Sequence, residues 1–282
     1  MLSFDKYQGL GNDFILFDCV HNELPVPNPA QIRRLCDRRF GVGGDGILLF
    51  ERASDPAASR MVYFNADGGR AETCFNGLCC IALHTVRTSV AAPFSNFIIA
   101  TDAGNVKAAV NIEAGLVEVE LPGPEFKPDL IPTTADSENF ELPLVNNRYV
   151  KGTTLSLGNP HFIEYRSEDN LDDLNRRVLD VGAEVERHPF FPRGMNFEAA
   201  FKVDDEDILM AVWERGVGRT LACGSGAAAS VCAGVRRNIL PANRPVKVRM
   251  TGGDLTVAIE ADFSRVKIIG EAKWVFAGQV SL

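Results

Sequence analysis

The chain has 282 residues, enough for one large domain or two domains of ordinary size. A composition of 46% apolar and 23% charged residues is typical of a globular protein, and a net charge of −8 argues against nucleic acid or an anionic membrane surface as a partner. Because no apolar run approaches the roughly 20 residues of a membrane span and the N-terminus has no signal-peptide pattern, we expect a cytoplasmic protein.

The first half of the chain predicts strands separated by glycine-rich turns. The turn at 9–13 is either a plain hairpin or a place where the backbone comes close to a ligand, with Asn12 offering its amide. Apolar residues at helical spacing predict a helix over 30–39. Strands are expected before this turn and at 14–18, 47–51, 61–64, 97–101, 105–112 and 116–121.

The second half repeats this order after a proline-rich segment, Pro122 to Pro132, which we take as the boundary between two domains. A helix is expected over 170–187. Strands are expected at 151–157, 162–165, 208–214, 245–250, 254–260 and 265–269, with another opening at 195–197, and the chain closes with an apolar stretch at 273–280. Many strands with few helices indicate the α+β class, in two similar halves.

Each half contains a cysteine that leads through a turn into a run of helix-forming residues. Cys74 precedes Phe-Asn-Gly and an apolar run to Val86, and Cys223 precedes Gly-Ser-Gly and an alanine-rich run. A helix N-terminus lowers the pKa of a thiol and binds carboxylates on its backbone N–H groups. This repetition indicates an internal duplication, and two thiols facing each other across a bound carboxylate would form a two-base site.

The seven cysteines are odd in number and irregularly spaced, so no disulfide framework is expected. Cys74, Cys79 and Cys80 lack the Cys-x2-Cys spacing of a structural zinc site, and no metal is expected. The sequence has no evident motif for a Schiff-base lysine, so pyridoxal phosphate is not expected and no other cofactor is indicated.

Six motifs together resemble those of the diaminopimelate epimerase family, in the family's order and over nearly the whole chain. They are Gly9-Leu-Gly-Asn-Asp-Phe, Phe64-Asn-Ala-Asp-Gly, Cys74-x-Asn-Gly, Gly158-Asn-Pro-His, Glu214-Arg-Gly-x-Gly and Ala222-Cys-Gly-Ser-Gly. The resemblance implies cofactor-independent epimerisation of LL-2,6-diaminopimelate to the meso isomer, in lysine and peptidoglycan precursor synthesis. It also makes a homodimer plausible.

The resemblance further implies two pseudo-symmetric α+β domains, each a mostly antiparallel sheet wrapped around a central helix, with an amino-acid substrate between them. From the sequence we place these domains at 1–122 and 123–269, and the resemblance implies that 270–282 returns to the first.

By the same resemblance, Cys74 and Cys223 exchange the roles of base and acid, and His161 and Glu214 adjust their protonation. From the residues alone, His161 could equally cap a strand and Glu214 could be a surface partner of Arg215. We expect the backbone N–H groups of both helix N-termini to hold the α-carboxylate, and an arginine and several amides to bind the distal end. The binding residues would be Phe75, Asn76, Gly77, Gly224 and Ser225 for the first group, and Asn12, Asn65, Asn159, Asn196 and Arg215 for the second.

Four positions depart from the family pattern: Phe75 replaces a glycine, Cys79 an arginine, Gly46 a glutamine and Arg219 a glutamate. If the position of Phe75 needs a positive φ, the phenylalanine is strained there. Nearby thiols also allow a regulatory disulfide of Cys74 with Cys79 or Cys80.

Two other functions stay open at this point. One is a racemase for another amino acid, such as histidine or proline, on the same scaffold. The other is a binding protein that has lost catalysis, although retention of both thiols argues against it. Isomerases of the phenazine-synthesis type share the fold but lack the cysteine pair.

Overall fold

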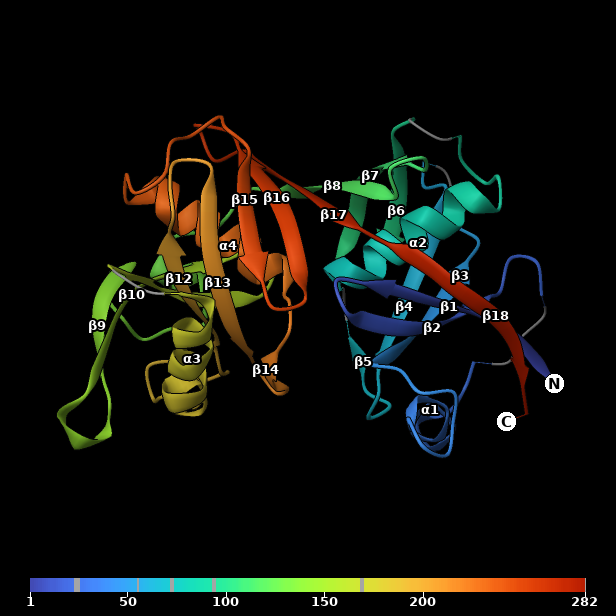
Figure 1. Cartoon of the computed structure of the whole chain (residues 1–282), viewed down its shortest axis with the longest axis horizontal. Helices are drawn as coiled ribbons and strands as arrows, with labels where there is room; N and C mark the ends of the chain where they lie inside the picture. The colour runs from blue at the N-terminus through green and yellow to red at the C-terminus, as the bar shows by residue number, and fades with distance from the viewer. Residues whose placement is uncertain (23–25, 55, 72–73, 93–94, 168–169, 282) are drawn as a thin grey trace. The chain divides into compact units, whose positions relative to one another are not determined.

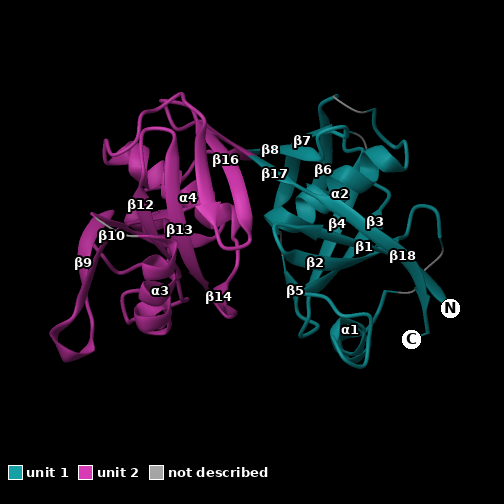
Figure 2. Cartoon of the chain, in the orientation of Figure 1, with its two compact units in different colours: residues 1–120, 269–282 teal, residues 121–268 magenta. Residues whose placement is uncertain are grey.

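The chain is described by a computed structural model, which covers residues 1–22, 26–54, 56–71, 74–92, 95–167 and 170–281. It divides into two compact units, shown in Figures 1 and 2. Unit 1 consists of residues 1–120 and 269–282, and unit 2 of residues 121–268. The C-terminal segment therefore completes the unit in which the chain begins.

Unit 1 contains two helices and most of the strands of the first half. The helices are α1 (Pro29–Cys36) and α2 (Phe75–Arg87). The strands are β1 (Leu2–Gly9), β2 (Asn12–Asp18), β3 (Gly46–Glu51), β4 (Ser59–Asn65), β5 (Arg70–Ala71), β6 (Phe97–Thr101), β7 (Gly104–Asn111) and the C-terminal β18 (Lys273–Val280). Two further strands run across the unit boundaries, namely β8 (Leu116–Pro122) and β17 (Arg265–Glu271).

Unit 2 contains the helices α3 (Leu171–Glu186) and α4 (Gly224–Arg236). Its strands are β9 (Asn139–Pro143), β10 (Tyr149–Ser156), β11 (Pro160–Arg166), β12 (Asn196–Lys202), β13 (Asp207–Glu214), β14 (Gly218–Thr220), β15 (Val246–Met250) and β16 (Gly253–Ile259). Among the described residues, no helix is long and apolar enough to cross a membrane.

The two units repeat one strand topology, which confirms the expected α+β fold in two similar halves. In unit 1, β2 runs parallel to β3, β3 is antiparallel to β4, and β4 is parallel to β6. In unit 2, β11, β12, β13 and β15 follow the same sequence of parallel, antiparallel and parallel pairs. Each parallel pair needs a crossover, and helices lie in these connections: α1 and α2 in unit 1, α3 and α4 in unit 2. The remaining described pairs are antiparallel.

The central helices α2 and α4 are buried along almost their whole length. Their sequences are apolar or small on every side, which suits a helix enclosed by a sheet. Cys74 and Cys223 occupy the N-cap positions in nearly the same extended conformation, with φ of −149° and −137°. Phe75 is the first residue of α2 and takes a helical φ, as Gly224 does in α4. Phe75 is not among the residues with a positive φ, so the condition for strain at this position is not met.

Most predicted elements are confirmed, and the differences have local causes. The helix expected over 30–39 ends at Cys36, because Asp37 turns the chain by accepting hydrogen bonds from the backbone N–H groups of Arg39 and Phe40. Strands β5, β9 and β14 were not predicted. Strands β5 and β14 are two and three residues long, too short for a clear alternation of apolar residues, whereas the five residues of β9 do alternate and were missed.

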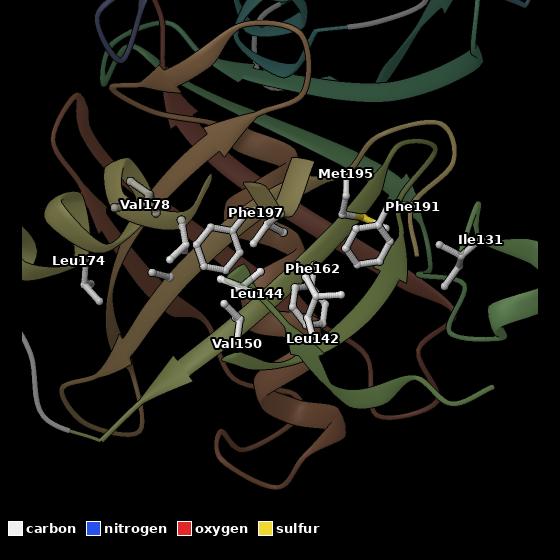
Figure 3. Close-up of a cluster of buried hydrophobic side chains, with 14 residues drawn as sticks. Ile131, Leu142, Leu144, Val150, Phe162, Leu174, Val178, Phe191, Met195 and Phe197 are labelled. Carbon is white, nitrogen blue, oxygen red and sulfur yellow. The ribbon is translucent and has the colours of Figure 1, made fainter. Parts of the chain in front are cut away.

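Helix α3 covers the core of unit 2 with its apolar side, as Figure 3 shows. Leu174, Val178, Val181 and Val185 recur at helical spacing, and the helix packs on β12 and β13. Within this cluster the Phe162 ring lies 5.0 Å from Phe140 and 5.5 Å from Phe191, measured between centroids. The strand β11 that carries His161 is thus fixed by a packed aromatic group directly beside it.

We predict that Phe162→Ala lowers the free energy of unfolding by about 3–5 kcal/mol, because it removes a fully buried ring and leaves a cavity. Urea denaturation of the full chain measures this. The control Tyr149→Ala alters an exposed ring in the same unit and should change stability by only about 0.5 kcal/mol. Equal effects of both substitutions would contradict the prediction.

Candidate active site

Cys223 lies at the N-terminus of α4, where its sulfur receives hydrogen bonds from the helix itself. The backbone N–H of Gly226 donates to Cys223 Sγ at 3.4 Å, and the Ser225 hydroxyl lies 3.4 Å from the same sulfur. The side chain is buried. Both contacts favour the thiolate, but burial outweighs them, so the lowered pKa that the sequence led us to expect for this thiol is wrong for Cys223.

Glu214, the last residue of β13, provides an acceptor for the Cys223 thiol. Burial raises the pKa of Glu214 above its ordinary value, while hydrogen bonds with Thr220 and Cys223 lower it. Burial also raises the pKa of Cys223 well above its ordinary value, and the charges of Glu214 and Glu198 raise it further. Cys223 is therefore held as a thiol beside a carboxylate that can take its proton. The alternative role of Glu214 as a surface partner of Arg215 is not what the structure shows.

His161 lies near the start of β11, fully buried, and its ring is bonded on both sides. Nδ1 is 2.7 Å from Glu198 Oε1, and Nε2 is 3.0 Å from Asn159 Oδ1. The Asn159 amide in turn donates to the Ser225 hydroxyl at 3.2 Å. These bonds bring His161, Asn159 and Ser225 together beside Cys223, although the sequence predicts that Asn159 and Ser225 bind opposite ends of the substrate.

Glu198 was missed at the level of sequence, although a signal was available. It is the one charged residue within the apolar run 197–201 of strand β12, between Phe197 and Ala199. A carboxylate at such a position needs a buried partner, and the neighbouring strand supplies His161.

Arg215 is carried by a tight turn that two other side chains hold in place. Asn196 Oδ1 accepts a hydrogen bond from the backbone N–H of Arg215 at 2.8 Å, and Glu186 Oε1 accepts one from Gly216 at 2.8 Å. Gly216 has φ of 78°, which favours glycine. The Arg215 guanidinium donates to the backbone carbonyl of Arg193 at 3.1 Å, is exposed, and forms no ion pair with the described residues. It can receive a carboxylate from solution.

Asn196 was expected to bind substrate, but its side chain already has two partners within the protein. Its amide nitrogen donates to the backbone carbonyl of Pro160 at 2.8 Å, and its oxygen holds Arg215. Asn196 thus links β11 to the turn that presents the guanidinium.

Cys74 lies at the N-terminus of α2 in unit 1, and its sulfur is 4.0 Å from Asn12 Oδ1. The orientation of Asn12 is set by Asp45, which accepts a hydrogen bond from the Asn12 amide at 2.8 Å and another from the backbone of Asp13. Arg38 binds the carboxylates of Asp13 and Asp45. Asn12 therefore lies at the thiol, and Asp45 is a supporting residue that the sequence did not reveal.

The other predicted residues of unit 1 lie around the first turn of α2 or on the sheet beneath it. Asn76 is buried, and its side-chain oxygen has no hydrogen-bond partner among the described residues. A Cβ on Gly77 would come within 3.0 Å of Leu48, so glycine lets the helix approach β3. Asn65 ends β4, directly opposite Gly46.

Three departures from the family pattern have a structural explanation. A Cβ on Gly46 would lie 2.6 Å from the Tyr63 ring, which occupies the space of a longer side chain. Arg219 donates to the Asn175 side chain and so ties β14 to α3. Cys79 and Cys80 are fully buried, and burial raises the pKa of both thiols.

A regulatory disulfide with Cys74 is therefore disfavoured, because a buried thiol with a raised pKa forms little thiolate. Each of the chain's cysteines, all of which are described, is a free thiol.

Comparison with known proteins identifies relatives over the full length of the chain. A sequence model described as diaminopimelate epimerase matches residues 4–126 and 153–275. The chain is 37% identical to the diaminopimelate epimerase of Nitrosomonas europaea and 39% identical to that of Nitrosospira multiformis, covering 100% of this chain and 99% of each relative.

Among solved structures, a probable proline racemase from Agrobacterium radiobacter matches with a TM-score of 0.72 and 14% identity, over 100% of this chain and 93% of that one. A hydroxyproline epimerase from Agrobacterium vitis matches with a TM-score of 0.71 and 15% identity, over 100% of this chain and 92% of that one. At these identities the match concerns the fold alone.

We predict that Glu214→Gln shifts formation of the Cys223 thiolate to lower pH. The raised pKa of Cys223 means that the thiol persists through neutral pH, and removal of a nearby negative charge lowers that pKa. The rate of alkylation at Cys223, followed against pH by peptide mass spectrometry, measures the shift. Cys19, whose pKa is raised to about 11 in unit 1, serves as the internal control and should not change. If the pH at which Cys223 becomes reactive is unchanged or higher in Glu214→Gln, the prediction is wrong.

Proposed function

The chain belongs to the diaminopimelate epimerase family, and we propose that it interconverts LL-2,6-diaminopimelate and meso-diaminopimelate by proton transfer between Cys74 and Cys223. The observation that supports this most directly is the repetition of one local structure. Both cysteines are the N-cap residues of buried central helices, at equivalent places in two units of the same topology.

Inversion at an α-carbon requires a base on one face of the carbon and an acid on the other. In our proposal, one cysteine removes the α-hydrogen as a thiolate while the other delivers a proton as a thiol. The reverse reaction exchanges the two roles. The carbanion-like transition state needs fixed dipoles close to the developing charge. The unpaired N–H groups of the first turns of α2 and α4 suit this task and would hold the α-carboxylate.

Before Cys223 can act as a base, it must lose its proton. Glu214 is the acceptor that we propose for this proton, because it is hydrogen-bonded to the thiol. The Gly226 N–H and the Ser225 hydroxyl would then stabilise the sulfur anion. When Cys223 acts as the acid, Glu214 stays ionised and the thiol proton goes to the carbon.

The distal end of diaminopimelate carries a second carboxylate and a second ammonium group. Arg215 is the residue that we propose for the distal carboxylate, since a guanidinium forms two parallel hydrogen bonds with that group. Asn65 and Asn159 would contribute further polar contacts. Asn196 would act indirectly, by fixing the backbone of Arg215.

A racemase for another amino acid is not favoured. The curated relatives at 37% and 39% identity are diaminopimelate epimerases, whereas the proline racemase match has 14% identity. A binding protein without activity is also not favoured, because Cys223 retains both a proton acceptor and donors for its thiolate.

Proton NMR in heavy water with the reduced full-length protein tests the proposed function. With LL-diaminopimelate we expect the meso isomer to appear and deuterium to enter the α-position. Absence of both changes, in a protein that is folded by circular dichroism, would overturn the assignment of substrate.

We predict that Cys74→Ala and Cys223→Ala each lower kcat for epimerisation by about 10² to 10⁴-fold, because each removes one of two proton-transfer groups. The same NMR assay measures both variants. Cys36→Ala alters a buried cysteine in α1 and is the matched control, for which activity should be retained. Near wild-type turnover by either of the first two variants would exclude a two-thiol mechanism.

We predict that Arg215→Lys raises KM for diaminopimelate by about tenfold, which corresponds to about 1.4 kcal/mol of lost binding. Lysine keeps the charge but lacks the planar fork that matches a carboxylate. Initial rates over a range of substrate concentrations separate KM from kcat. The exposed neighbour Arg193 provides the control Arg193→Lys, whose KM should be that of the wild type. If both variants bind the substrate equally well, the distal carboxylate is held elsewhere.

A further inference from the structure

The carboxylate of Glu198 is fully buried in unit 2, where a charge costs free energy unless it has close partners. Only one of its oxygens is satisfied: Oε1 meets His161 Nδ1, and Oε2 has no hydrogen-bond partner among the described residues. Such an incompletely paired carboxylate does not increase the stability of the fold, so we looked to the neighbouring site for its role.

A continuous series of hydrogen bonds connects Glu198 to Cys223. It passes from Glu198 to the His161 ring, from His161 Nε2 to Asn159 Oδ1, from the Asn159 amide to Ser225, and from Ser225 to the sulfur. Because a carboxylate oxygen faces Nδ1 and an amide oxygen faces Nε2, a ring with a proton on each nitrogen satisfies both bonds. The Ser225 hydroxyl accepts from Asn159, so its own hydrogen is directed at the sulfur.

Unit 1 offers an internal comparison, because its corresponding residue is Leu48. Leu48 is the third residue of β3, as Glu198 is the third residue of β12, and the two strands occupy the same place in the repeated topology. Both lie beneath the first turn of a central helix. A Cβ on Gly77 would meet Leu48 at 3.0 Å, and a Cβ on Gly226 would meet Glu198 Oε1 at 2.7 Å. The fold therefore accepts an apolar residue here, and the carboxylate is a feature of the Cys223 site.

We propose that Glu198 is a positioning residue of the Cys223 site, which keeps the His161 ring protonated on both nitrogens and so orients Asn159 and Ser225 toward the sulfur. This inference rests on the proposed function of Cys223, and Glu198 itself touches neither the sulfur nor, in our account, the substrate. The pair of carboxylate and imidazolium has no net charge, and the attraction between its members offsets part of the free energy lost on burying them. Among the described residues, the titratable groups that interact electrostatically with this pair are Glu214, with both members, and Cys223, with Glu198.

Nitrogen NMR of the full chain labelled with ¹⁵N-histidine tests the proposal without any substrate. The chain has four histidines, and His161→Asn identifies the signal of His161 by its loss. We expect both ring nitrogens of His161 to carry protons at neutral pH. In Glu198→Gln, which keeps the size of the side chain but removes its charge, we expect the ring to lose one proton.

Kinetics provide the second measurement. We expect Glu198→Gln to lower kcat by about 10-fold to 100-fold while KM changes by less than about twofold. Effects of this size are typical of residues that orient a reacting group through hydrogen bonds without contacting the substrate. The matched control is Glu164→Gln, which removes a buried carboxylate from the adjacent strand β11, where Glu164 pairs with Arg177. This control should leave kcat and the His161 signal unchanged, even if it lowers thermal stability.

A neutral His161 ring in the wild type would overturn the proposal, and so would wild-type kcat in Glu198→Gln. If Glu198→Gln fails to fold, Glu198→Leu, which copies unit 1, takes its place with the same expectations. An inactive wild-type protein would contradict the proposed function instead, and the nitrogen spectrum would still decide the state of His161.

Discussion

A sulfur atom at the first turn of a buried helix is the arrangement on which the rest of this site depends. The usual N-cap residues are serine, threonine, asparagine and aspartate, whose oxygens accept from the unpaired N–H groups of the helix. Here cysteines take that position in both α2 and α4. Burial opposes ionisation of Cys223, and the N–H of Gly226 and the hydroxyl of Ser225 favour it. A thiol under opposing influences of this kind can exchange a proton with a carbon acid in either direction.

The two units share a topology but have diverged around their thiols. Cys74 is accompanied by the neutral amide of Asn12, which Asp45 orients, and an apolar Leu48 lies beneath the helix. Cys223 has the carboxylate of Glu214 beside it and Glu198 beneath the helix. Duplication therefore explains why there are two similar thiols. The polar groups around them have diverged, so that an amide lies beside Cys74 and a carboxylate beside Cys223.

The sequence predicted the elements that depend on local patterns, and it failed where contacts are distant along the chain. The small and apolar residues after Cys74 and Cys223 sufficed to predict two helices with a thiol at each start. The roles of Glu198 and Asp45 were not predicted, because they arise from hydrogen bonds to residues 37 and 33 positions away. Whether Phe75 needs a positive φ could not be read from the sequence, and the structure shows that it does not, because the residue is the first of a helix. Gly46 is explained by Tyr63 and the Phe64 backbone on the neighbouring strand, which the local sequence does not reveal.

In the proposed mechanism two separate groups handle the proton, one on each face of the α-carbon. The most direct measurement is the deuterium content of substrate and product, by mass spectrometry, in the earliest turnovers of LL-diaminopimelate in heavy water. Our account predicts that the first meso-diaminopimelate carries solvent deuterium at one α-carbon, while the remaining LL substrate still carries hydrogen. Meso product that retains the original hydrogen would show that a single group removes and returns the proton, and would contradict the account.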